Sequence, residues 1–131
     1  MSAEWPLVKP GVKGARVKAL QRLLLHRGAD LEVDGTFGAG TEKALKAFQS
    51  ANGLDADGIA GTTTWTKVVV LVKAGQRGEP VTAVQELVGV PADGVFGPAT
   101  EKAVRAFQER VHLSADGIAG PHTWQLLIVE S

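Results

Sequence analysis

An aspartate, two glycines and a threonine recur at fixed spacing, as D-G-x-x-G-x-x-T, in four places along the chain. Carboxylates and hydroxyls held at fixed spacing can bind ligands, and a carboxylate can also act as a general acid or base. The same residues can instead form a turn, because Asp accepts hydrogen bonds from amides ahead of it and Gly tolerates positive φ. The pattern alone leaves a ligand site and a structural turn both open. The four copies are DGTFGAGT (34–41), DGIAGTTT (57–64), DGVFGPAT (93–100) and DGIAGPHT (116–123).

A catalytic or metal site needs partner groups that the sequence does not offer. There is no cysteine, and the three histidines lack metal-ligand spacing such as H-E-x-x-H. The DADG segment at 55–58 resembles the start of a calcium loop, but its fifth and twelfth positions are Ile59 and Thr66. Glu42 and Glu101 fall in the first turn of predicted helices, where a carboxylate stabilises the helix dipole. We expect no catalytic residue, no metal and no cofactor, and therefore no enzyme.

Composition narrows the class of protein further. The 131 residues carry 14 basic and 14 acidic side chains, a balance that argues against a nucleic-acid binder or a polybasic membrane anchor. The longest apolar run, at 68–72, is far shorter than the roughly 20 residues that span a bilayer. The N-terminal stretch lacks the charged and apolar regions of a signal peptide. We expect a monomer that binds neither nucleic acid nor membrane.

The chain is an internal repeat. Segment 7–23 aligns with 71–87 at an offset of 64, whereas 34–49 aligns with 93–108 at an offset of 59. The second repeat is therefore five residues shorter before its first D-G segment. We predict two domains, 1–69 and 70–131, and because the junction VVVLVK (68–73) is apolar, we expect them to pack on each other.

Each repeat is predicted to contain three helices, which lie near 15–26, 39–52 and 62–69 in the first repeat. The helix of the second repeat that corresponds to 15–26 is predicted to begin at Pro80. The predicted fold class is all-α: two tandem small three-helix bundles with short D-G turns, packed through the short apolar junction. Lys43, Lys46 and Gln49 are predicted to face solvent. The predicted buried faces carry Val17, Leu20, Leu23 and Leu24; Ala44, Leu45, Phe48 and Ala51; Trp65, Val68 and Val69; and Trp124, Leu127 and Ile128.

The D-G segments are predicted to begin helices. Their second Gly precedes each helix, and Pro98 and Pro121 follow it at a first helical position. The large apolar residues within the segments are expected to fill the core. Free amides at two helix starts per repeat would suit carboxylates and carbonyls, and would form a polar groove. The apolar residues concerned are Phe37, Ile59, Phe96 and Ile118.

Linked motifs at matching spacing give the chain a recognisable signature. The first repeat contains, in this order, V-x-x-L-Q-x-L, D-G-x-F-G-x-x-T, A-x-x-x-F-Q and D-G-I-A-G-x-x-T-W. The second repeat contains the same motifs, with Val84 in place of the Leu of L-Q. This closely resembles the bacterial peptidoglycan-binding domain of type 1, a three-helix module attached to many cell-wall hydrolases. The resemblance implies non-catalytic binding of peptidoglycan, through glycan or stem peptide, outside the cell or at its wall. It also implies that a fused or partner protein, such as a wall hydrolase, is targeted there.

The resemblance places the ligand in a shallow groove near the loops and helix starts. Val95 lacks the hydroxyl of Thr36 and the second repeat has the shorter loop, so we expect it to bind more weakly or only to pack. A protein-interaction module that reuses the fold stays open as the alternative, whereas a wall hydrolase or a DNA-binding helix-turn-helix is disfavoured. The ligand-binding residues implied are Asp34, Thr36, Phe37, Thr41, Asp57, Gly58 and Ile59, with Asp93, Val95, Phe96, Thr100, Asp116, Gly117 and Ile118 in the second repeat.

Overall fold

The computed structural model describes residues 4–131, which form six helices and isolated antiparallel bridges. The predicted all-α class and the three helices per repeat are confirmed. None of the helices in this range is long and apolar enough to cross a membrane. The helices are α1 (Ala15–His26), α2 (Ala39–Ala51) and α3 (Thr62–Val68) in the first repeat, then α4 (Glu79–Val88), α5 (Pro98–Arg110) and α6 (Pro121–Val129) in the second.

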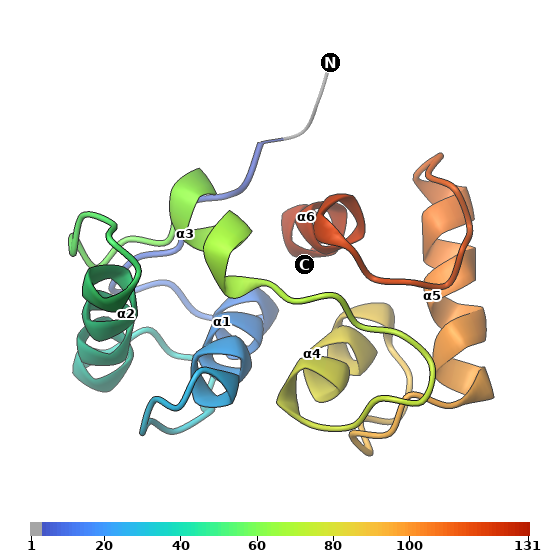
Figure 1. Ribbon diagram of the computed structural model, residues 1–131, viewed down its shortest axis with the longest axis horizontal. Helices are drawn as coiled ribbons and strands as arrows, with labels where there is room; N and C mark the ends of the chain where they lie inside the picture. Colours follow the sequence, from blue (N-terminus) through green and yellow to red (C-terminus); the bar gives the residue numbers. More distant parts are fainter. Residues whose placement is uncertain (1–3) are drawn as a thin grey trace.

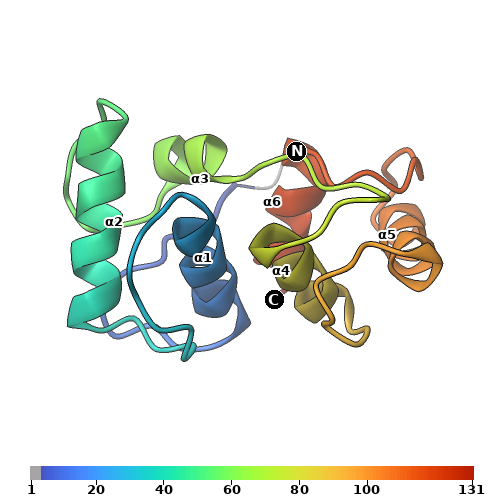
Figure 2. The same ribbon diagram turned by 60° about the horizontal axis from the view of Figure 1, so that its bottom comes forward.

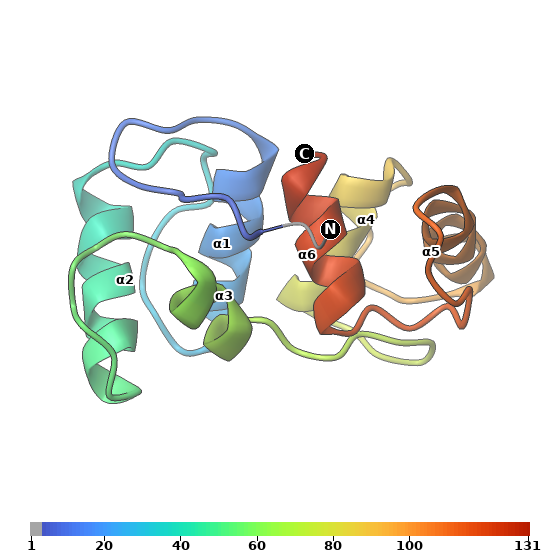
Figure 3. The same cartoon turned by 90° about the horizontal axis from the view of Figure 1, so that it is seen from above.

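The two repeats meet through their first helices. Along the long axis of the molecule the order is α2, α1, α4, α5, which all three views show (Figures 1, 2 and 3). Helix α1 packs against α4, while α2 packs on α1 and α5 on α4, so α2 and α5 lie at opposite ends. Helix α6 also contacts α4. Each repeat is thus a three-helix unit, and the contact between units is made at the centre.

The cores of the two units are built from equivalent residues at helical spacing. The predicted apolar faces of α1, α3 and α6 are buried, apart from a partly buried Val69 that follows α3. The Trp65 indole is fully buried and stacks on Trp5, with ring centroids 5.6 Å apart. Its Nε1–H donates to the Pro6 carbonyl at 3.1 Å, as that of Trp124 donates to the Val70 carbonyl at 2.7 Å. The tryptophans therefore pack inside the units, as expected of that residue on a helical core face.

Charged side chains join the two repeats where α1 meets α4. The Arg22 guanidinium on α1 donates to the Glu86 carboxylate through Nε at 2.8 Å and Nη2 at 3.1 Å. Its Nη1 donates to Glu79 at 2.8 Å. Val69 and Val70 are partly buried against the core, which confirms the expected packing at the junction. The interface is therefore more polar than the junction sequence alone predicts.

Three sequence predictions about burial are wrong. Ile59 and Ile118 are only half-buried, because the next residue in each segment pairs through its backbone with the chain ahead of the first helix and turns inward instead. Those inward residues, Ala60 and Ala119, are fully buried. Ala51 is exposed at the end of α2. Gln49, predicted to face solvent, is 1% exposed.

Candidate functional site

Four glutamines are buried, and each holds one D-G segment. The Gln21 side-chain oxygen accepts hydrogen bonds from the backbone N–H groups of Asp34 at 3.1 Å and Gly35 at 2.9 Å. Its Nε2 lies 2.9 Å from Asp34 Oδ1, 3.1 Å from the Thr36 carbonyl and 2.9 Å from Thr41 Oγ1. Two amide hydrogens serve three acceptors, so one hydrogen is shared. A single side chain thereby satisfies the polar groups of the whole turn.

The same arrangement recurs in the other three segments. Each glutamine oxygen accepts the N–H of the D-G glycine, and each Nε2 lies 2.9–3.0 Å from the Asp, a backbone carbonyl and the Thr hydroxyl. The interval from Gln to Asp is 8 residues in these copies and 13 in the first. The five additional residues therefore form a longer loop that leaves the network intact. The glutamines concerned are Gln49, Gln85 and Gln108.

In three of the four segments, hydrogen bonds within the turn lower the pKa of the aspartate. Its Oδ1 accepts the N–H two residues ahead, from Thr36 to Asp34 and from Val95 to Asp93, both at 3.0 Å. This backbone bond, followed by the glutamine bond, lowers the pKa of Asp34, Asp93 and Asp116 below the ordinary value of 3.8. The D-G-x-x-G-x-x-T pattern is therefore a structural turn, which is held by one carboxylate, one hydroxyl and a buried glutamine amide.

The D-G-x-x-G-x-x-T pattern does not include these glutamines, although the sequence contains a signal for their burial. A Gln precedes the aspartate by eight residues in three of the four copies, at the end of the A-x-x-x-F-Q or V-Q motif. Helical periodicity alone assigns Gln49 to the polar face of α2. The buried position becomes predictable only when the Gln is counted as part of the D-G segment.

A groove lies beside the start of the third helix in each repeat. The α3 groove, of about 340 Å³, and the α6 groove, of about 400 Å³, are each lined by ten residues, nine of which occupy corresponding positions in the two repeats. Both have one wall made by the D-G segment and the other by the chain ahead of the first helix. The α3 groove is lined by Leu7, Gln49, Gly53, Leu54, Asp55, Asp57, Ile59, Gly61, Thr63 and Thr64. The α6 groove is lined by Leu71, Gln108, Leu113, Ser114, Asp116, Ile118, Gly120, Pro121, His122 and Thr123.

The two most exposed large apolar side chains among the described residues occupy the same place in the two grooves. Leu7 is 63% exposed and Leu71 is 51% exposed, at equivalent positions ahead of the first helix. An exposed leucine by itself is ordinary. Two at matching positions, each beside a groove, indicate an apolar contact surface that is available to a ligand.

A third groove lies at the start of α2. It measures about 390 Å³ and its lining includes Asp34, Thr36 and Thr41 together with Leu31 and Gly38. Thr36 is exposed, whereas Thr41 is buried and its hydroxyl is occupied by Gln21. Predicted site residues thus reach the surface at both helix starts of the first repeat.

The remaining predicted site residues divide between surface and core. Asp57, Ile59, Asp116 and Ile118 line the two matched grooves. Phe37 and Phe96 are 2% exposed, and Gly58, Gly117 and Thr100 are also buried, whereas Asp93 and Val95 are exposed. Sequence reasoning missed the other residues that line the two grooves, among them Leu7, Leu54 and Thr63 in the first repeat and Leu71, Leu113 and His122 in the second.

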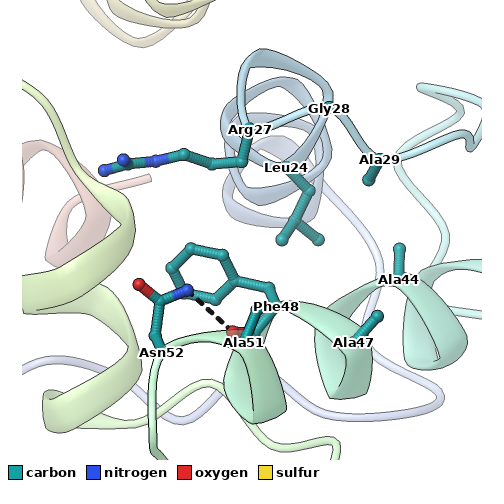
Figure 4. Close-up of a pocket in the computed structure, with 9 residues that line it drawn as sticks. All are labelled: Leu24, Arg27, Gly28, Ala29, Ala44, Ala47, Phe48, Ala51 and Asn52. Atoms are coloured by element: carbon teal, nitrogen blue, oxygen red, sulfur yellow. Dashed lines mark hydrogen bonds between the residues drawn. The ribbon is translucent and has the colours of Figure 1, made fainter.

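A separate cavity of about 280 Å³ lies between α1 and α2 (Figure 4). None of the predicted ligand-binding residues lines it. Its walls are apolar, with Leu24, Ala44 and Phe48 facing one another. Arg27 Nη2 at its edge donates to the Lys67 carbonyl at 2.8 Å, and the Asn52 amide donates to the Phe48 carbonyl at 2.8 Å. Because these polar groups already serve helix ends, the cavity is a poorer candidate for a polar ligand than the grooves.

No group of three potential metal ligands occurs among residues 4–131. The grooves are lined by aliphatic side chains, carboxylates, hydroxyls and a glutamine amide, with the His122 imidazole in addition in the α6 groove. Such a surface can bind a ligand by apolar contact and hydrogen bonding.

Comparison with known proteins identifies bacterial enzymes that are similar to this chain over part of their length. The zinc D-Ala-D-Ala carboxypeptidase of Streptomyces albus G is 54% identical over 64 residues, which are 47% of this chain and 25% of the relative. The spore cortex-lytic enzyme of Oceanobacillus iheyensis is 41% identical over 64 residues, 48% of this chain and 23% of that enzyme. The chain thus spans about a quarter of the length of these two relatives.

One solved structure with a similar sequence is a peptidoglycan-binding protein from Clostridioides difficile. It is 40% identical, with a TM-score of 0.48, and the match covers 48% of this chain and 40% of that one. The family model of the peptidoglycan binding domain matches residues 13–68 and again 77–127. This double match covers most of the chain and shows that it belongs to the peptidoglycan-binding domain family, with two copies in tandem.

Proposed function

We propose that the chain binds bacterial peptidoglycan without catalysis, as a monomer, and targets a fused or partner protein such as a wall hydrolase to the cell wall. The observation that supports this most is the duplication of the groove beside the third helix. Both repeats have this groove and an exposed leucine beside it, which supports a role for the surface in addition to the fold. The working location would be the cell wall or the space outside the cell.

The residues would act in two ways. Those lining a groove would contact the ligand: the leucine and isoleucine by apolar contact, and the Asp and Thr side chains by hydrogen bonding. Those in the core of each D-G segment would hold the groove in shape. The first set is Asp34, Thr36, Asp57, Ile59, Asp116 and Ile118, and the second is Phe37, Thr41, Gly58, Phe96, Thr100 and Gly117, while Asp93 and Val95 are exposed in their loop.

The direct test is co-sedimentation of the chain with purified insoluble peptidoglycan. We expect the wild type to sediment at micromolar concentration and the Leu7→Ala/Leu71→Ala double variant to bind at least fivefold more weakly, because apolar contact is lost in both grooves. Val129→Ala is the matched control, since Val129 is exposed but lies outside both grooves.

Retention of the chain in the supernatant would contradict wall binding and favour the protein-interaction alternative. Equal binding by the double variant and the control would contradict the assignment to the grooves. Release of soluble muropeptides by the chain alone would contradict the absence of catalysis.

A further inference from the structure

The α3 and α6 grooves share their framework but differ in charge. Asp55 in the α3 groove corresponds to Ser114 in the α6 groove, and Thr63 corresponds to His122. The second carboxylate, Asp57, has its counterpart in Asp116. The α3 groove is thus lined by two carboxylates and no cation, whereas the α6 groove is lined by one carboxylate and an imidazole.

One ion pair beside the D-G glycine is common to the two grooves. Lys46 pairs with Glu42 at 3.7 Å, and in the other repeat Arg105 pairs with Glu101 at 3.8 Å. Both pairs lie against the D-G glycine of the neighbouring segment, Gly58 or Gly117. Each cation is therefore balanced by its own carboxylate in the same helix. The exposed Asp55 forms none of the ion pairs found among the described residues, so its charge faces the solvent and any ligand in the α3 groove.

The walls of the α3 groove are aliphatic. Leu7, Leu54 and Ile59 line it, while the Trp65 ring that could stack on a sugar is fully buried. An aliphatic surface that ends at exposed carboxylates fits a hydrocarbon chain that ends in a cation. In a wall polymer such a group is the side chain of a diamino acid in the stem peptide, with a primary ammonium at its end.

Resting on the proposed function, we propose that the α3 groove selects the free ammonium of a stem-peptide diamino acid, whereas the α6 groove binds the stem peptide without this preference. The hydrocarbon part of the diamino acid lies along Leu7, Leu54 and Ile59, and its ammonium meets Asp55 and Asp57. Cross-linking converts this amine to a neutral amide, so the α3 groove prefers stem peptides that are not cross-linked through that amine.

The test is a nuclear magnetic resonance titration of the full chain with two soluble probes. One probe is a disaccharide tripeptide whose third residue is lysine, with both sugars N-acetylated, and the other is the same compound acetylated on the lysine amine. We expect the backbone signals of Leu7 and Asp55 to report about two- to fivefold tighter binding of the free amine, the range that an exposed ion pair supplies. The signals of Leu71 and Ser114 should report no difference between the probes.

Exchange of the distinguishing residue makes the test specific. Asp55→Ser should abolish the preference in the α3 groove, and Ser114→Asp should create it in the α6 groove. Both positions are exposed, so neither exchange is expected to disturb the fold, which thermal unfolding checks. The preference should also weaken as salt is raised from 0.05 to 0.5 M, because screening shortens the reach of exposed charges.

Equal affinity of the α3 groove for both probes would overturn the ammonium preference and leave peptidoglycan binding intact. Preference for the free amine that survives Asp55→Ser would overturn the assignment to this carboxylate. If neither probe shifts signals of either groove, the site given under the proposed function fails and the preference fails with it.

Discussion

At the scale of the residue, the buried glutamine is the side chain on which each D-G segment depends. The side chain of Gln49 on α2 is buried under the D-G segment that begins α3. Its amide group forms hydrogen bonds with Asp57, Thr64, the Gly58 N–H and the Ile59 carbonyl. No buried side-chain nitrogen or oxygen among the described residues lacks a partner. Because an unpaired buried polar group costs far more than one hydrogen bond supplies, this saturation makes the glutamine hard to replace.

The change Gln49→Ala is expected to lower the free energy of unfolding by about 2–4 kcal/mol, since it leaves the Gly58 N–H unpaired and opens a cavity. Ser50→Ala, at the next and exposed position of α2, should change it by less than about 0.5 kcal/mol. Urea denaturation measures both. A cost below 1 kcal/mol for the glutamine variant would show that the network contributes little.

The aspartates of the segments should make stability fall in acid. The pKa of Asp93 is lower in the folded chain than its ordinary 3.8, so the unfolded state binds more protons. Its contribution is therefore fully present above pH 4 and is lost as pH falls through the folded pKa. In Asp93→Asn the denaturation midpoint should fall less steeply between pH 4.5 and 2.5 than in the wild type, and an unchanged slope would contradict the shift.

At the scale of the element, the D-G segment fixes how each helix begins. The chain ahead of α1 pairs with both segments of its repeat, Val8 with Ala60 and Lys13 with Thr36, and the second repeat copies both bridges. The segments therefore sit between a bridge on one side and a buried glutamine on the other. The bridge and the glutamine together fix where each helix begins. The loop before the first D-G segment can therefore differ by five residues between the repeats while the hydrogen-bond network stays the same.

The D-G glycine contributes through its positive φ and through its close packing. Gly58→Ala is expected to cost about 2 kcal/mol, because φ is +72° and a Cβ would lie 3.0 Å from Lys46 Cε and 3.1 Å from Glu42 Cγ. Gly53→Ala is the matched control: φ is +71° and a Cβ there meets nothing within 4 Å, so about 1 kcal/mol is expected. Thermal and urea unfolding give both values. Equal costs would show that the packing against α2 is unimportant.

At the scale of the whole molecule, the two units form one body through α1 and α4. Each unit has about 60 residues, near the lower size at which a domain folds alone without staples. The Arg22 side chain is only 19% exposed and forms ion pairs with two carboxylates of the other unit. Arg16 on α1 also donates to the carbonyl of Ser131 at 2.9 Å, which ties the end of the second unit to the first.

The change Arg22→Ala is expected to lower the free energy of unfolding by about 1–3 kcal/mol, since it leaves the half-buried Glu86 without its bidentate partner. It should also lower the denaturant m-value, as the units begin to unfold separately. Arg110→Ala, which removes the exposed pair with Glu130, should cost less than 1 kcal/mol and keep the m-value. Similar results for the two variants would mean that the Arg22 ion pairs contribute little to holding the units together.

Local patterns in the sequence were enough to predict the helices, the duplication and most of the core. Residues such as Leu20 and Trp65 are buried because 3.6-residue periodicity places them on one face, a property of a single helix. The family resemblance was likewise carried by motifs within one repeat. The domain boundary between residues 69 and 70 stays a prediction.

Only the tertiary structure decided which polar residues are buried and where the grooves lie. Gln49 looks polar and exposed within α2, yet it is buried because the next D-G segment folds back over it. Ala60 replaces Ile59 in the core because it pairs with Val8, which lies 52 residues earlier in the chain. Hydrogen bonding and burial between distant segments carry no local periodicity, so the helices and the turns that begin them were predictable from the sequence, whereas the buried glutamine networks and the grooves were not.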